Sequence, residues 1–238
     1  MRKNIILMIL ASSLFLTSCN ESPKTHVIFI DITLSTTISK ATQNIKALLN
    51  SLTKRIDDKV LSGETVIIYP IHAQTLSATA IGRWKMPIAK DMNWKKERSR
   101  MLSEISSIVN KKLFIEPIIS SKSRLHTSIL PIFYKLNNIS LDKNIEVTII
   151  SDMIQDNSIM SFPKQFISID NNSVKTLAKQ TYVEMKGEIA LNNQTISILI
   201  PGTEAGNRYG DSFNRKVNSF WTTFFREAGA RVFITDLS

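Results

Sequence analysis

Cysteine, glycine, proline and histidine are all scarce in this chain of 238 residues, and each shortage excludes a class of protein. A single cysteine cannot form an internal disulfide, so the chain is not a disulfide-stapled scaffold. Seven glycines and seven prolines are too few for long low-complexity or disordered stretches. The three histidines, His26, His72 and His126, are too far apart for zinc-ligand spacing, and we expect strand or loop residues there.

Several catalytic motifs are also missing. The chain has no Gly-x-Ser-x-Gly, so nothing supports a serine hydrolase. The glycine-containing segment 201–206 lacks the Lys-Ser/Thr pair of a phosphate-binding loop. There is no internal repeat and no second composition regime, and the hydrophobic fraction of 43% is ordinary for a globular protein. We therefore expect one domain with a sizeable core.

The amino terminus has the pattern of an export signal. Arg2 and Lys3 precede an apolar segment at 5–16, which is too short to span a membrane. The sequence Leu16-Thr17-Ser18-Cys19 follows directly, and it resembles the lipobox of bacterial lipoproteins. The resemblance implies cleavage before Cys19 and lipid attachment, such as palmitate, to that cysteine. Residues 1–18 are then a signal peptide and residues 19–24 a lipidated tether, with a domain at 25–238.

The chain is basic, with 30 lysines and arginines against 20 acidic residues, and the predicted export limits which partners this charge can meet. An exported protein rarely meets nucleic acid, so we expect no nucleic-acid partner. By resemblance to Gram-negative lipoproteins, Asn20 after the cysteine favours the outer membrane, with the domain in the periplasm of the cell envelope. Lys95, Lys96, Arg98 and Arg100 form a basic cluster, with Trp84 and Trp94 nearby. We interpret it as a solvated helix face, the alternative being contact with lipid headgroups or an acidic partner.

Apolar runs alternate with amphipathic stretches along the rest of the chain. Uninterrupted apolar runs predict strands that are buried on both faces, at 26–30, 65–71, 145–150, 195–200 and 231–235. Apolar residues at helical spacing predict helices at 38–56, 93–112, from Pro131 onward, 174–185, and from Asp211 to Gly229. Residues 75–84 suit an edge strand or hairpin. This alternation predicts an α/β fold with a mostly parallel sheet and helices on both faces.

Polar residues follow two of the predicted strands. Asp31, Thr33 and Ser35 come directly after the first strand, Asp152 follows the third, and Thr127 lies in a polar loop before a helix. Ligand sites of parallel sheets lie beyond the carboxyl ends of the strands, so we expect these side chains to meet. Carboxylate and hydroxyl oxygens are ligands for hard cations such as Mg²⁺. The pattern therefore predicts a Mg²⁺ or Mn²⁺ site.

The order of these residues resembles the von Willebrand factor A domain and its metal-ion-dependent adhesion site (MIDAS). That motif is Asp-x-Ser-x-Ser, then a Thr from a later loop, then an Asp after a later strand, with Thr33 replacing a serine here. The resemblance implies a three-layer Rossmann-like fold and a binding protein rather than an enzyme. A protein partner would supply an acidic side chain to the ion, and Ser128, Met153 and Asp156 would form the rim that contacts it.

Two alternatives remain open. Asp31 with Asp152 and Asp156 also resembles a haloacid-dehalogenase-type phosphatase, in which Asp31 is the nucleophile and the later pair holds Mg²⁺. That family has a second Asp where this chain has Thr33, and Lys143 is the candidate for its phosphate-binding lysine. The other alternative is a metal-free scaffold on the same fold, which binds partners through its loops.

Overall fold

The computed structural model describes residues 23–33, 42–90, 92–115, 126–140, 144–185, 191, 194–201 and 204–237. The predicted signal peptide, Cys19, Ser35 and Lys143 lie outside these ranges.

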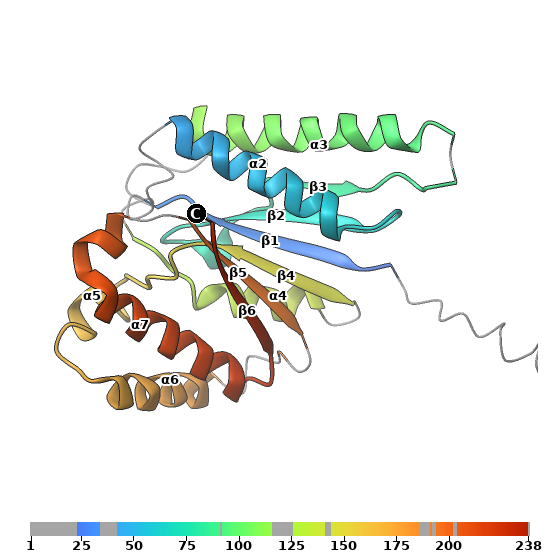
Figure 1. Cartoon of the computed structure of the whole chain (residues 1–238). Coiled ribbons are helices and arrows are strands. Elements are labelled where there is room, and N and C mark those ends of the chain that lie inside the picture. The colour runs from blue at the N-terminus through green and yellow to red at the C-terminus, as the bar shows by residue number, and fades with distance from the viewer. Residues whose placement is uncertain are drawn as a thin grey trace, which may run out of the picture.

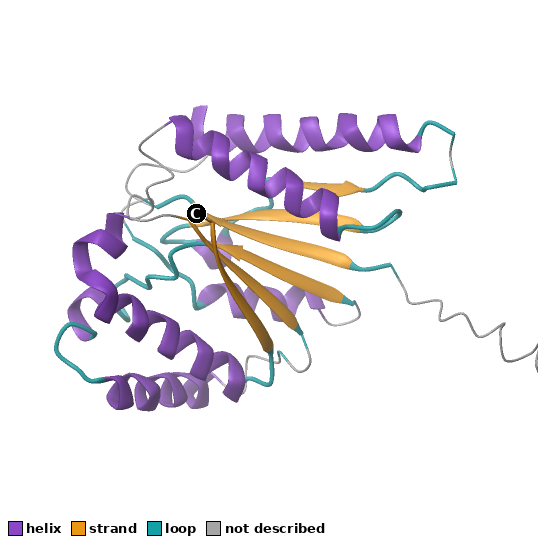
Figure 2. Ribbon diagram, in the orientation of Figure 1, coloured by secondary structure: helices purple, strands orange, loops and turns teal. Residues whose placement is uncertain are grey.

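Six strands form one sheet in the order β3-β2-β1-β4-β5-β6 (Figures 1 and 2). The strands are β1 (Thr25–Asp31), β2 (Thr65–Ile71), β3 (Gly82–Lys85), β4 (Ile145–Ile150), β5 (Thr195–Pro201) and β6 (Arg231–Leu237). All neighbouring pairs are parallel except β2 with β3, which is antiparallel and lies at one edge. The mostly parallel α/β fold predicted from the sequence is confirmed.

Helices cover both faces of this sheet and make three layers (Figure 1). The helices are α2 (Thr42–Lys59), α3 (Trp94–Asn110), α4 (Pro131–Ser140), α5 (Phe162–Gln165), α6 (Asn171–Met185) and α7 (Glu204–Glu227). The described residues also include short turns of other helix types, η2 (Thr75–Ser77) and η3 (Lys111–Ile115). Helices α2 and α3 pack on one face, and α4 to α7 supply the apolar residues of the other.

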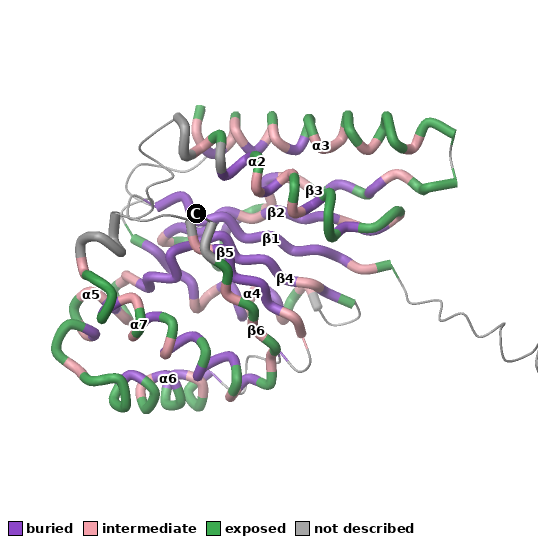
Figure 3. Tube along the Cα trace, viewed as in Figure 1, coloured by how far each residue is buried: buried purple, intermediate pink, exposed green. Residues whose placement is uncertain are grey.

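Strand β1 shows why apolar runs produce this arrangement. Alternate side chains of a strand point to opposite faces, so a strand in the middle of three layers must be apolar at every position. Val27 and Phe29 join the core beneath α4, α6 and α7, while Ile28 and Ile30 join the core beneath α2 and α3. The whole of β1 is buried, as Figure 3 shows.

The predicted boundaries differ from the observed ones where local geometry changes. The predicted edge strand or hairpin at 75–84 is a single 3₁₀ turn followed by β3. The helix predicted at 93–112 ends at Asn110 and continues as the π turn η3. The last helix starts earlier than Asp211, but Gly210 breaks its regular geometry at φ 76°, so a helical segment does begin at the predicted residue.

No helix in the described part of the chain is long and apolar enough to cross a membrane.

Phe133 lies at the centre of an aromatic cluster and gives a stability test. Its ring is fully buried and lies 5.2 to 6.0 Å from those of Trp221, Phe224 and Phe225. We predict that Phe133→Ala lowers the free energy of unfolding by about 3–5 kcal/mol, because it leaves a cavity. Urea denaturation followed by circular dichroism measures this. The control Phe233→Ala, at a position 60% exposed, should change stability by less than about 0.5 kcal/mol. Equal effects of the two would contradict the assigned core.

Candidate functional site

Asp31 is the last residue of β1, and its carboxylate is fully buried at the carboxyl end of the sheet. Oδ1 accepts hydrogen bonds from the backbone N–H of Thr33 at 2.9 Å and from the Thr33 hydroxyl at 2.7 Å. Oδ2 accepts one from the Ser151 hydroxyl at 2.6 Å. Ser151 follows β4, so this carboxylate joins the ends of two neighbouring strands.

Thr127 extends this network from the loop before α4. Its hydroxyl donates a hydrogen bond to Thr33 Oγ1 at 2.8 Å, and its side chain is 2% exposed. The structure thus brings Asp31, Thr33 and Thr127 together, as the sequence predicted. They form a connected series of oxygen atoms that we call the oxygen cluster: Asp31, Thr33, Thr127 and Ser151.

Asp152 adjoins the oxygen cluster through the chain itself, because it directly follows Ser151. Its side chain is 6% exposed, and Oδ1 accepts a hydrogen bond from the backbone N–H of Ile154 at 3.0 Å. The second carboxylate of the predicted site is therefore buried at the same end of β4. The remaining predicted ligand, Ser35, is outside the described residues.

Backbone contacts hold the two loops of the site against each other. Thr127 and Asp156 exchange backbone hydrogen bonds of 3.0 Å in each direction. Gln155, which precedes Asp156, is fully buried. Its Oε1 accepts hydrogen bonds from the backbone N–H groups of Ile129 and Leu130 in the other loop. These N–H groups lie just before α4, where a helix leaves its first donors without internal partners. Gln155 therefore fixes the position of Thr127 relative to the end of β4.

The backbone after Ser151 is also constrained. Met153 has a positive φ of 59°, which is uncommon for a residue other than glycine. Its N–H donates to Ser151 Oγ at 2.9 Å, and its C=O accepts a hydrogen bond from Trp221 Nε1 at 2.7 Å. The buried indole of α7 thus holds a strained turn in place, and that turn positions the Ser151 hydroxyl on Asp31.

The three residues expected to form a partner-binding rim differ in exposure. Asp156 is half-buried, whereas Ser128 and Met153 are 2% and 1% exposed. Ser128 accepts a hydrogen bond from Asn157 Nδ2 at 3.0 Å. Asp156 is accordingly the most accessible of the three, while Ser128 and Met153 support the loop from inside.

The electrostatics of Asp31 are unusual. Burial raises the pKa of its carboxyl group, and the hydrogen bonds from Ser151 and Thr33 partly oppose that rise. Among the described residues, no lysine, arginine or histidine forms an ion pair with it. A buried carboxylate is costly unless it is paired, bound to a cation or protonated.

The donors of this site fit a hard cation in their chemistry. Carboxylate and hydroxyl oxygens suit Mg²⁺. A hydroxyl that donates a hydrogen bond to Asp31 still has lone pairs on its oxygen, which can bind an ion. Among the described residues of the predicted ligand set, the carboxylates are Asp31 and Asp152. In the described part of the chain, no group of three or more His, Cys, Asp or Glu side chains is arranged to hold a metal. An ion here would depend on hydroxyls and on ligands from outside.

The residues of the phosphatase alternative are arranged differently. Thr33 stands where that family has its acid/base carboxylate, and its hydroxyl donates a hydrogen bond to Asp31. Asp156 is tied by its backbone to Thr127 and Ser161. Lys143 is outside the described residues. Among the described residues, no observed contact favours this alternative.

Lys135 of α4 places a positive charge at the carboxyl end of β2, which the sequence analysis did not single out. Its Nζ donates hydrogen bonds to the C=O groups of Leu76 and Ala78 and lies 4.9 Å from the centre of the Tyr69 ring. Burial lowers the pKa of Lys135, and burial together with this lysine's charge lowers the pKa of His72. No sequence motif marks this contact, because it joins residues of β2, η2 and α4.

The fold and the oxygen cluster define the class of protein: a three-layer α/β domain with a buried polar site at the carboxyl ends of a mostly parallel sheet. No protein-family model and no curated protein sequence matches the chain. It is similar to two solved structures of proximal thread matrix protein 1 from the mussel byssus, at 11% and 13% identity and a TM-score of 0.42 in both cases. The matches cover 87% and 90% of this chain but 49% and 42% of the mussel chains, so this chain spans less than half of their length.

The raised pKa of Asp31 predicts a pH-dependent stability. The folded state holds this proton more tightly than the unfolded state, whose carboxyl has a pKa near 3.8. The contribution of this carboxyl group to the free energy of unfolding is therefore fully present below that pH, and it is lost as the pH rises through the raised pKa. Asp31→Asn removes the cost of ionisation, so in EDTA its melting temperature relative to the native protein should rise from acid to neutral pH. A difference that stays constant with pH would contradict this.

Proposed function

We propose that this protein is a lipid-anchored binding protein of the cell envelope, whose domain docks a protein partner through a divalent cation. The observation that carries the proposal is the Asp31 carboxylate, which is buried without an ion-pair partner among the described residues and surrounded by hydroxyls. The resemblance of Asp31, Thr33, Ser35, Thr127 and Asp152 to a MIDAS motif supports the same assignment. The lipobox-like sequence before Cys19 supports the anchor.

Each group has a separate task in this function. Asp31 and Asp152 supply negative charge, and the hydroxyls of Thr33 and Thr127 supply neutral oxygen ligands. Ser151 and the N–H of Thr33 hold the Asp31 carboxylate in one orientation. A bound Mg²⁺ or Mn²⁺ would leave coordination positions for water or for a carboxylate from a partner. Because the site has few charged ligands, such a partner would strengthen ion binding, and the ion would strengthen partner binding.

Calorimetric titration of Mg²⁺ and Mn²⁺ tests the site. We predict saturable binding to the native protein and at least a tenfold weaker affinity in Asp31→Ala, which removes one of two carboxylates. The matched control is Asp58→Ala, an exposed acidic residue at the carboxyl end of α2, which should bind as the native protein does. Circular dichroism checks that both variants fold. Equal binding by the native protein and folded Asp31→Ala would refute the metal site, and Mg²⁺-dependent phosphate-ester hydrolysis would favour the phosphatase alternative.

Cys19 gives an independent test of the anchor. It is the only cysteine of the chain, so any thioether-linked lipid must be attached there. We predict that the native protein, expressed in a Gram-negative bacterium, incorporates radiolabelled palmitate and pellets with membranes. Cys19→Ser should lose the label, and Ser18→Ala, which keeps a small residue before the cysteine, should retain it. Label in the Cys19→Ser protein would exclude this anchor.

A further inference from the structure

The tether joins the domain at the amino ends of the parallel strands. The C=O of Lys24 accepts a hydrogen bond from the N–H of Thr65 at 3.1 Å, so the chain enters beside the start of β2. Thr65 pairs in turn with Lys85, the last residue of the antiparallel strand β3. In Figure 1 this end of the sheet also carries the carboxyl end of α2 and the amino end of α3. We call this end of the domain the basic pole.

Large apolar side chains are exposed at the basic pole. Leu61 is 65% exposed, Ile88 is 51% exposed and Met92 is fully exposed, and Trp94 is half-buried nearby. Leu61, Trp94 and Lys95 line a shared hollow of about 670 Å³ between the end of α2 and the start of α3. Apolar side chains set among basic ones are the composition of surfaces that enter the headgroup region of a bilayer.

Lysines lie in the same segments as these apolar residues. Among the described residues of the pole, the exposed lysines are Lys59, Lys85, Lys90, Lys95 and Lys96, and Lys24 is half-buried. The exposed acidic residues are fewer: Asp57, Asp58 and Glu97. The described residues of the pole therefore have a positive balance where the tether joins it.

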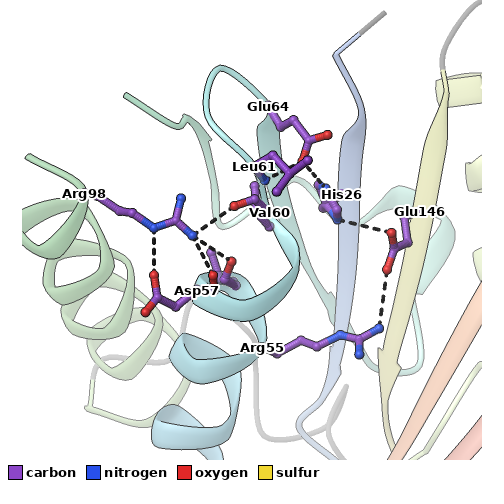
Figure 4. Close-up of polar contacts among 9 residues, drawn as sticks. His26, Arg55, Asp57, Val60, Leu61, Glu64, Arg98 and Glu146 are labelled. Carbon is purple, nitrogen blue, oxygen red and sulfur yellow. Dashed lines mark hydrogen bonds and ion pairs between the residues drawn. The ribbon is translucent and has the colours of Figure 1, made fainter. Parts of the chain in front are cut away.

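Internal contacts engage three carboxylates of this region, those of Asp57, Glu64 and Glu146, as Figure 4 shows. Asp57 pairs with Arg98 at 2.7 Å, and that arginine also donates to the C=O of Val60 at the end of α2. Glu64 is buried and lies 2.8 Å from His26. Glu146 lies 3.4 Å from Arg55. These acids are held by partners within the domain, which leaves the lysine charges of the pole largely unbalanced.

We propose that the basic pole rests on an anionic phospholipid surface, with Trp94, Ile88 and Met92 in the headgroup region and the lysines on lipid phosphates. This proposal rests on the lipid anchor at Cys19. Five residues separate that cysteine from β1, and the six Cα-to-Cα steps from Cys19 to Thr25 span at most about 20 Å. The tether therefore holds the pole next to the membrane. There the lysines can contact lipid phosphates and the apolar side chains can enter the headgroup region. Each lysine near such a surface raises the affinity about fivefold.

Quenching of tryptophan fluorescence tests the contact on the full, acylated protein. The protein is placed on vesicles of phosphatidylethanolamine and phosphatidylglycerol in which the phosphatidylglycerol chains are brominated. Trp84 and Trp221 are buried at 8% and 1% exposure, so quenching reports Trp94. We expect strong quenching by the native protein and its loss in Trp94→Phe. Lys95→Glu with Lys96→Glu should reduce quenching to the level seen on phosphatidylcholine vesicles with the same brominated chains.

A matched variant reverses two lysines elsewhere. Lys164 and Lys175 are exposed on α5 and α6, away from the pole, so Lys164→Glu with Lys175→Glu should be quenched as the native protein is. Acylated protein without Trp94 quenching overturns the proposal and leaves the basic pole to an acidic protein partner. Equal losses in both double variants would also overturn it. Intact mass separates the failures: a chain without an acyl group at Cys19 refutes the anchor, and the proposal with it, but not the metal site.

Discussion

The parallel hydrogen bonding of β1 to β2 on one side and to β4 on the other positions both the oxygen cluster and the point where the tether enters the domain. Parallel pairing aligns the carboxyl ends of strands that are far apart in sequence, so Asp31 and Ser151 meet although 120 residues separate them. It also requires a crossover between each pair of strands, and these crossovers supply the helices of the outer layers. A change in the register of β1 would move Asp31 away from Ser151 and place its apolar residues on the wrong faces.

Burial of the Asp31 carboxylate carries an energetic cost. The carboxylate has no ion-pair partner among the described residues, and the hydrogen bonds from Ser151 and Thr33 only partly offset its lost hydration. Neighbouring contacts hold the loops around Asp31 in place, so that these loops do not move apart and let water reach the carboxylate. Gln155 fixes the loop of Thr127, and Trp221 holds the strained turn at Met153. Rigid, costly polar groups of this kind are typical of sites that become stable when a ligand binds.

Strands and the centre of the site were accessible from the sequence because each leaves a local pattern. Apolar runs mark β1, β2 and β4, and the polar residue that ends a run marks the edge of the sheet. The antiparallel strand β3 left only a weak pattern, because it has four residues and one buried side chain. Its geometry depends on Gly82, where a Cβ atom would collide with the ring of Trp84. The Trp84 ring lies over Gly82 of the same strand. The spacing of apolar residues in the sequence gives no sign of such a contact.

Supporting residues of the site left no such pattern. Gln155 and Trp221 act through backbone groups of other segments, so their sequence neighbourhoods resemble those of any buried residue. Ser151 was visible only as the residue before Asp152, and its hydrogen bond to Asp31 depends on the pairing of β1 with β4. Sequence patterns thus find groups placed by their own element, whereas contacts between elements require the fold.

The polarity of the sheet also relates the two proposals to each other. The tether enters at the amino end of β1 and the oxygen cluster lies at its carboxyl end, seven residues later. At about 3.3 Å per residue, the strand separates them by about 23 Å. A domain whose basic pole rests on lipid therefore points the oxygen cluster away from the membrane. A partner would meet the proposed ion site from the aqueous side, without displacing the pole. The proposed membrane contact and the proposed ion-dependent docking would therefore use opposite ends of one sheet.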